Sequence, residues 1–307
     1  MPLPPVRPLH GLVAATHTPF HDDGSLNLDA VERQCEHLVA NRVAAAFIGG
    51  TTGESSSLTC DERRQLAERW GAVVRGTPLR LVVHVGANCV EDAKSLARHA
   101  ETVGAEAISA LTPSYFKPRS LDILIQTMTE IAAAAPGTPF YFYDIPSMTG
   151  VQLPMPDFLA QAQHRIPTLT GLKFTNSDLM AYQHCLRADA GRWDVPWGID
   201  EYLLGALALG ARGAVGSTYN FCAPMARRTM EVFAVNDFVT ARDEQYRSVQ
   251  VIQLLGSFGY MGAAKATMEQ LGVPVGPPRL PNGALTPQQK LELRGRLEAI
   301  GFFDWVA

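Results

Sequence analysis

Short apolar runs alternate with longer amphipathic segments along most of this 307-residue chain. The runs are apolar at successive positions, which is typical of parallel strands buried on both faces. Eight runs are expected as strands, and each precedes a segment of helix length. This order predicts an α/β protein with a (β/α)8 TIM barrel, not an open doubly wound sheet. The expected strands span residues 12–16, 45–49, 80–85, 106–111, 139–143, 169–173, 195–198 and 213–216.

The chain continues well beyond the eighth expected strand. Residues 1–223 are expected to hold the barrel core up to that strand, and residues 224–307 the last barrel helix and further C-terminal helices within the same domain. The expected strand 195–198 is short and contains Pro196. The expected helices span residues 27–41, 60–75, 90–103, 119–135, 155–164, 178–190 and 201–210, then one after Pro224, and the appended segments 238–256, 260–271 and 286–300.

The composition is typical of a globular protein and argues against several classes of partner. Hydrophobic residues make up 47% of the chain and charged residues 18%, so a sizeable core can form. The net charge of −4 has mixed signs throughout, which predicts neither a nucleic-acid nor a membrane partner. The five cysteines are far apart and form no CxxC pair, so no disulfide framework or metal site is expected. With a proline-rich N-terminus unlike a signal peptide, these features predict a cytoplasmic protein.

Polar residues cluster where the expected strands end. In a TIM barrel, the catalytic groups lie at the C-terminal ends of the strands. The coincidence therefore predicts an enzyme. The clusters are Thr51–Glu54, Tyr143, Lys173–Thr175, Gly198–Glu201 and Gly216–Thr218.

Lys173 ends the apolar run LTGLK, which would place its side chain at the mouth of the barrel. Burial disfavours the charged ammonium and so favours the neutral amine that attacks a ketone. The resulting iminium is an electron sink for C–C cleavage. The alternative is a lysine that extends to solvent or pairs with a carboxylate.

Two neighbouring features would complement such a lysine. Tyr143 ends the run PFYFY and could transfer a proton, although it could equally be one more packed aromatic. In Gly49–Glu54, glycines can expose consecutive N–H groups, and Thr51 and Thr52 add hydroxyl donors for a carboxylate. A plain strand–helix turn remains the alternative there. The segment is not a phosphate-binding P-loop, because the GK[ST] ending is absent.

Several motifs, in order, resemble a known family. GGTTGES at 49–55, Tyr-x-x-Pro at 143–146 and GLK at 171–173 are similar to the pyruvate-dependent lyase family that includes dihydrodipicolinate synthase and N-acetylneuraminate lyase. The likeness runs from GLVAATHTPF at 11–20 to GPPRLP at 276–281. Longer motifs resemble the N-acetylneuraminate lyase branch: GTTGESSSLTCDERRQLAERW at 50–70, LKFTNSDL at 172–179 and GIDEYLLGALALGARGAVGSTYN at 198–220.

The resemblance implies a class I aldolase that splits N-acetylneuraminate into pyruvate and N-acetylmannosamine, with no cofactor beyond a covalent Schiff base. It implies that Lys173 forms this Schiff base and that Tyr143 shuttles the proton. It also implies a homotetramer, in which Tyr115 enters the site of a neighbouring subunit. The implied substrate-binding residues are Thr51 and Thr52 for the carboxylate, Thr175 near the breaking bond, and Gly198, Asp200, Glu201 and Ser217 for the polyhydroxy tail.

Two positions depart from the family patterns. Met148 occupies the place where dihydrodipicolinate synthases carry a carboxylate-binding arginine, which disfavours their reaction. Asp144 stands where sialic acid lyases tend to have Asn or His, and its charge could disfavour a Tyr143 phenolate. The alternatives are the same chemistry on another 2-keto-3-deoxy sugar acid, or a non-catalytic member that only binds pyruvate or a sugar acid. Asp200 and Glu201 could likewise serve only as acidic residues at a helix N-terminus.

Overall fold

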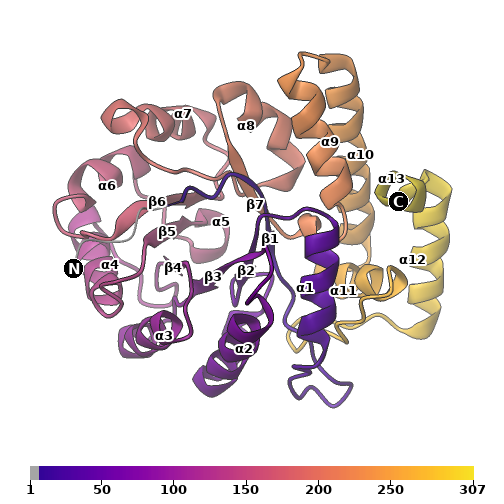
Figure 1. Ribbon diagram of the computed structural model, residues 1–307, viewed down its shortest axis with the longest axis horizontal. Coiled ribbons are helices and arrows are strands. Elements are labelled where there is room, and N and C mark those ends of the chain that lie inside the picture. The colour runs from indigo at the N-terminus through magenta and orange to yellow at the C-terminus, as the bar shows by residue number, and fades with distance from the viewer. Residues whose placement is uncertain (1–6) are drawn as a thin grey trace.

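Seven parallel strands curve into a barrel at the centre of the molecule, and helices surround it (Figure 1). The computed structural model describes residues 7–307. Hydrogen bonds join the strands in the order β6-β5-β4-β3-β2-β1-β7. The strands are β1 (Gly11–Ala15), β2 (Ala45–Ile48), β3 (Arg80–His84), β4 (Ala107–Leu111), β5 (Phe140–Asp144), β6 (Leu169–Phe174) and β7 (Gly213–Gly216).

The expected strand at 195–198 is not a regular strand, and the prediction was wrong in this respect. An extended segment fills its place and closes the barrel through isolated bridges, Phe174 to Trp197 and Trp197 to Ala214. The Trp197 N–H donates to the Gly213 carbonyl, and Val215 N–H donates back to Trp197. Pro196 has no N–H to contribute to a continuous ladder, which accounts for the interruption. The eightfold barrel arrangement is nevertheless confirmed.

The strands alternate between two apolar clusters, as the period of two requires. Interior side chains such as Val13, Phe47 and Tyr141 fill the barrel. Side chains of the opposite parity, such as Phe142 and Leu172, pack outward against the helices. Both faces are therefore buried, which explains the apolar runs in the sequence.

The surrounding helices match the expected segments to within a few residues at each end. Helix α2 (Cys60–Val73) begins with a capping box, in which the Thr59 side chain accepts from the Glu62 N–H and the Glu62 side chain accepts from the Thr59 N–H. The short helix α5 (Pro146–Thr149) was not expected. The outer helices are α1 (Ala30–Ala40), α2 (Cys60–Val73), α3 (Val90–Thr102), α4 (Leu121–Ala133), α6 (Met155–Ala162), α7 (Leu179–Arg187), α8 (Leu203–Leu209) and α9 (Ala223–Ala234).

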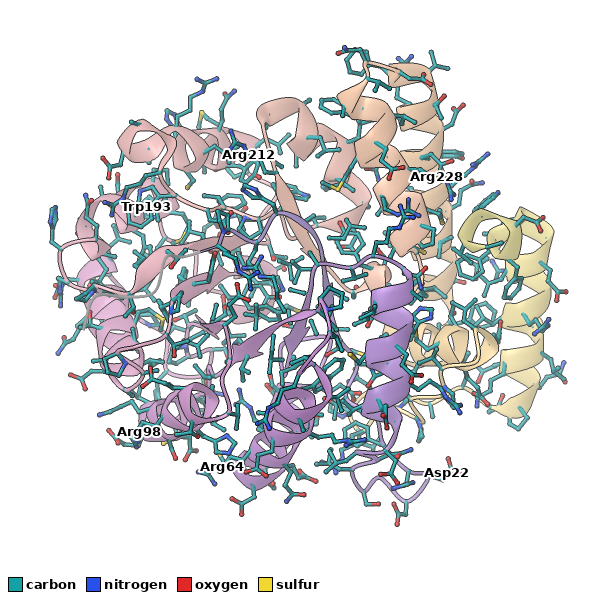
Figure 2. The ribbon with its side chains drawn as sticks, viewed as in Figure 1. Asp22, Arg64, Arg98, Trp193, Arg212 and Arg228 are labelled. Carbon is teal, nitrogen blue, oxygen red and sulfur yellow. The ribbon has the colours of Figure 1, made fainter. Side chains whose placement is uncertain are left out.

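A C-terminal group of helices packs against one side of the barrel (Figure 1). It has an apolar cluster of its own, which includes Val251, Leu255, Leu293 and Phe302. Within residues 7–307, no helix is both long and apolar enough to span a bilayer. The labelled charged side chains Asp22, Arg64 and Arg98 lie at the outer edge (Figure 2). The C-terminal helices are α10 (Phe238–Ser257), α11 (Tyr260–Gln270), α12 (Pro287–Ile300) and α13 (Phe302–Val306).

Candidate active site

A cavity of about 410 Å³ opens at the C-terminal ends of the barrel strands. It is lined by nine of the residues that the sequence singled out, together with residues of the C-terminal helices. Two larger hollows lie elsewhere among the described residues, but neither contains Lys173 or Tyr143. The predicted residues that line it are Thr51, Thr52, Tyr143, Lys173, Thr175, Gly198, Asp200, Glu201 and Ser217.

Lys173 and Tyr143 are neighbours across the β5–β6 pair. Both are buried, at 5% and 3% exposure, yet both side chains line the cavity. The Lys173 Nζ lies 3.7 Å from the centroid of the Tyr143 ring and 4.6 Å from that of Phe47. The faces of these two aromatic rings therefore pack against the amine beside the cavity. Such surroundings suit a nucleophilic amine better than a lysine extended into solvent.

Thr51 and Thr52 follow β2 and reach the same end of the cavity. The Thr51 hydroxyl lies 3.4 Å from the Tyr143 hydroxyl, so the threonine loop and the candidate proton shuttle are in hydrogen-bond range.

His84 holds the start of this loop through a hydrogen bond. Its Nε2 accepts from the Leu111 N–H, so its Nδ1 donates to the Gly49 carbonyl. Both ring nitrogens of the buried His84 thus have hydrogen-bond partners. We call Thr51, Thr52, Tyr143 and Lys173 the keto-acid end.

Asp200 lines another part of the same cavity, apart from the keto-acid end. Its carboxylate accepts from the N–H and the hydroxyl of Thr218, at 2.8 and 2.6 Å. Burial raises the pKa of Asp200 to about 6, against the lowering effect of these hydrogen bonds and of the Lys173 charge. Gly216 permits this packing, because a Cβ there would lie 1.9 Å from the Asp200 Oδ1. Asp200 therefore organises the site and is more than an acidic residue at a helix start.

Thr175 lines the same cavity and lies next to Gly198. Its hydroxyl is buried and has no hydrogen-bond partner within the described residues, although it lines the cavity. A Cβ on Gly198 would lie 1.9 Å from this hydroxyl, so only glycine leaves it in place. A buried unpaired hydroxyl is costly unless a ligand satisfies it. We call Gly198, Asp200, Glu201 and Ser217 the tail end.

The C-terminal helices complete the wall of the tail end, which the sequence did not predict. Ile252 of α10 and Tyr260 and Met261 of α11 line the cavity. The Tyr260 hydroxyl lies 2.6 Å from the Ser217 hydroxyl, and the two form a hydrogen bond. No local motif marks these residues, because they reach the site only through the packing of the appended helices.

Asp144 does not lie beside the reacting groups, contrary to the concern that its position after Tyr143 raised. It does not line the cavity, and its Oδ2 accepts a hydrogen bond from the Asn176 side-chain amide at 3.2 Å. Burial raises the pKa of Asp144 to about 6. Met148, in contrast, does line the mouth, so no cation occupies the place of the arginine discussed above.

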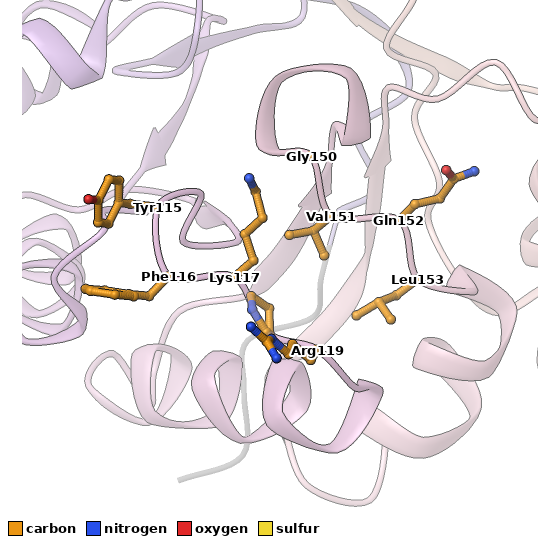
Figure 3. Close-up of a pocket in the computed structure, with 9 residues that line it drawn as sticks. Tyr115, Phe116, Lys117, Arg119, Gly150, Val151, Gln152 and Leu153 are labelled. Carbon is orange, nitrogen blue, oxygen red and sulfur yellow. The ribbon is translucent and has the colours of Figure 1, made fainter.

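Tyr115 is the one predicted site residue that lies away from the cavity. It is 79% exposed and stacks edge to face on Phe116 in the β4–α4 loop. Figure 3 shows both rings on one side of a separate hollow of about 570 Å³, with Val151 and Leu153 across from them. A role in catalysis would require another subunit, so that role stays a prediction.

Comparison with known proteins places this architecture in a family. The model of the dihydrodipicolinate synthetase family matches residues 8–300. The chain belongs to this family of barrel enzymes. The mouse N-acetylneuraminate lyase is 39% identical and is aligned over 98% of this chain and 95% of its own length.

Solved structures show the same similarity. The N-acetylneuraminate lyase of Proteus mirabilis matches with a TM-score of 0.94 and 39% identity, covering 96% of this chain and 100% of its own. That of Aliivibrio salmonicida matches with a TM-score of 0.94 and 41% identity, covering 97% and 98%. The predicted family is confirmed.

Proposed function

We propose that this protein is a class I aldolase that cleaves N-acetylneuraminate to pyruvate and N-acetylmannosamine. The observation that carries the proposal is one cavity with a buried lysine and tyrosine at one end and hydroxyl-binding groups at the other. The similarity to enzymes named N-acetylneuraminate lyase, at 39% identity over nearly the whole chain, supports this substrate.

The reaction begins at the keto-acid end. The Lys173 amine attacks C2 of the open-chain sugar acid, and loss of water gives an iminium, while Thr51 and Thr52 hold the carboxylate. The Lys173 amine is placed for this step, because it is buried in the protein yet lines the cavity where the keto acid would bind. The iminium then serves as the electron sink, so the bond cleavage needs no metal and no organic cofactor.

The carbon–carbon bond breaks beside Tyr143. The Tyr143 hydroxyl accepts the proton of the C4 hydroxyl and passes its own proton to the carboxylate of the substrate, while the C3–C4 electron pair moves toward the iminium. N-acetylmannosamine leaves as the aldehyde, and an enamine of pyruvate remains on Lys173. Protonation at C3 and hydrolysis release pyruvate and restore the amine. Thr175 supplies its unpaired hydroxyl close to this bond.

The tail end selects for a polyhydroxylated chain. Asp200 and Glu201 offer acceptors, and Ser217 offers a hydroxyl that can both donate and accept. A site built to bind hydroxyls discriminates strongly against substrates that lack them, because its buried polar groups are then left unpaired. Met148 at the mouth cannot bind a second carboxylate, which argues against the dihydrodipicolinate synthase reaction.

Trapping tests the chemistry. Pyruvate with borohydride should reduce the iminium to a stable adduct, and mass spectrometry should locate it on Lys173. The Lys173→Ala variant should form no adduct and lose lyase activity. An adduct on another lysine, or none, would refute the mechanism. Binding of pyruvate without turnover, unchanged in Lys173→Ala, would instead indicate a non-catalytic binding protein.

A substrate panel tests the specificity. Pyruvate release should be fastest from N-acetylneuraminate among sugar acids that differ in length and acyl group. Normal trapping with negligible turnover of N-acetylneuraminate would point to another 2-keto-3-deoxy sugar acid.

We also propose a homotetramer in which Tyr115 enters the site of a neighbouring subunit. The exposed Tyr115–Phe116 pair supports this, since large exposed aromatics are enriched at subunit contacts. Sedimentation of the wild type and of Tyr115→Ser would test it. A fully active monomer would contradict it.

The five free cysteines fit a reducing compartment, which supports a cytoplasmic location.

A further inference from the structure

We propose that a buried ion pair between Glu54 and Lys265 positions the threonine loop, so that helix α11 sets the affinity of the site for the keto acid. Neither residue lines the cavity, and both act as positioning residues through Thr51 and Thr52. The inference rests on the proposed function, because it assigns the carboxylate of the substrate to that loop.

Glu54 lies two residues after Thr52 and points away from the cavity into the C-terminal region. Its side chain is fully buried, and its Oε1 lies 2.8 Å from the Lys265 Nζ. Its Oε2 accepts hydrogen bonds from the Arg279 N–H at 2.9 Å and from the Asn282 amide at 3.2 Å. Glu54 has a φ of 53°, in the left-handed region that a non-glycine residue adopts only at a cost. The partners of its carboxylate hold it in this conformation.

Lys265 is held in place beside Glu54 by burial and by two backbone carbonyls. Its side chain is 1% exposed, and its ammonium donates to the carbonyls of Thr18 and Pro277 at 2.8 and 3.0 Å. Burial lowers the pKa of Lys265 to about 8, while the Glu54 charge opposes that shift. The nearby His17 is fully buried, and burial lowers its pKa to about 3, so it adds no competing charge.

The loop transmits the position of Glu54 to the threonines because it is hydrogen-bonded internally. The Glu54 N–H donates to the Thr51 carbonyl, and the Ser55 N–H donates to the Gly50 carbonyl. The Thr18 hydroxyl donates to the Gly53 carbonyl at 2.7 Å, which ties the loop to the segment that also accepts from Lys265. A shift of Glu54 therefore moves the Thr51 and Thr52 hydroxyls relative to Lys173.

Helix α11 lines the tail end directly and is linked to the keto-acid end through Glu54. Lys265 holds the threonine loop, and Tyr260, five residues earlier, forms the hydrogen bond to Ser217. A single rigid helix thus connects the carboxylate end to the tail end. Breaking an ion pair on one side leaves a buried charge without its partner, which forces that side to rearrange.

The test separates affinity from catalysis in Glu54→Gln and Lys265→Met. With pyruvate as the probe, the concentration that gives half-maximal borohydride trapping should rise roughly tenfold or more, as for removal of one partner of a buried ion pair. The maximal trapping rate should change by only about twofold, because Lys173 and Tyr143 stay in place. KM for the sugar acid should rise in parallel, with kcat nearly retained.

Glu244→Gln is the matched control, because Glu244 is also a buried carboxylate, paired with Arg228 and Arg247 on α9 and α10. It should lower Tm without raising either KM or the half-maximal pyruvate concentration. If the Glu54 and Lys265 variants resemble this control, the pair is only structural and the inference is overturned. Asn282→Ala, which removes one outer contact of Glu54, should give a smaller rise in KM in a folded protein and keeps the test decisive if Lys265→Met does not fold. A failure of wild-type trapping would refute the proposed function instead.

Discussion

The two ends of the cavity are built differently. The keto-acid end takes Tyr143 and Lys173 from adjacent, hydrogen-bonded strands, and its threonines follow a third strand directly. The tail end takes its residues from one-turn 3-10 segments and turns, and α10 and α11 cover it. Reaction chemistry therefore sits on the most rigid part of the barrel, and substrate selection on a part whose shape depends on the appended helices.

Because the two ends are built on different elements, mutations can separate bond cleavage from substrate selection. Positioning within fractions of an ångström matters most for bond-breaking groups, which favours strand ends as their support. The tail end needs mainly hydrogen-bonding groups, and irregular segments can supply these. Changes at the keto-acid end should impair every substrate, whereas changes at the tail end should impair only long hydroxylated ones.

The largest effect is expected for Tyr143→Phe at the keto-acid end. It removes the candidate proton acceptor but keeps the ring that packs on Lys173. We expect kcat to fall roughly 10²–10⁴-fold for every sugar acid, as for loss of a general acid–base group. Steady-state kinetics measures this. Tyr182→Phe, which removes a buried hydroxyl bonded to the Val195 carbonyl outside the cavity, is the control and should retain kcat. A Tyr143→Phe variant with normal kcat would remove Tyr143 from the mechanism.

Gly216→Ala should break the tail end while sparing the keto-acid end. The new Cβ would overlap the Asp200 carboxylate and displace it from Thr218. We expect kcat/KM for N-acetylneuraminate to fall about 100-fold, since several hydrogen bonds are lost together. Trapping with pyruvate should stay within about twofold of wild type. Gly205→Ala, where no atom lies within 4 Å of the added Cβ, is the control. An equal loss in both assays would show that the two ends are not separable.

Ser217→Ala should give a smaller effect of the same kind. It removes one hydroxyl from the tail end and leaves the Tyr260 hydroxyl without this partner. KM for the sugar acid should rise roughly 2- to 10-fold, the value of one neutral hydrogen bond. The half-maximal pyruvate concentration in trapping should not change. A rise in both would place Ser217 in contact with the pyruvyl part of the substrate.

Asp144→Asn should affect stability and not activity, because Asp144 lies outside the cavity. Its folded pKa of about 6 exceeds the ordinary 3.8, so the wild type loses stability as pH rises from about 4 to about 6. The asparagine lacks this loss and should be more stable by about 1–3 kcal/mol above pH 6, with the difference vanishing below pH 4. Chemical unfolding across this pH range measures it. A pH-independent difference, or a large change in kcat, would contradict this account.

Much of the barrel and of the keto-acid end could be predicted because their signals are local. A strand buried on both faces needs a short apolar run, and a polar residue that ends such a run must emerge at the barrel mouth. Lys173 and Tyr143 could be placed in this way. The extended segment through Trp197 could not be distinguished from a strand, since its bridges depend on partners in β6 and β7.

The strand–helix repeat, the family motifs and the chemistry available at the strand ends can all be read from the amino-acid sequence. Three features appear only in the folded protein: Asp144 turns away from the cavity, Tyr260 reaches Ser217, and Lys265 pairs with Glu54 across 211 positions of the chain. The physical reason is the range of the interactions. Strand burial and capping depend on neighbours in sequence. The Asp144–Asn176 contact depends on how β5 and β6 pair, and the other two contacts depend on how α11 packs against the barrel.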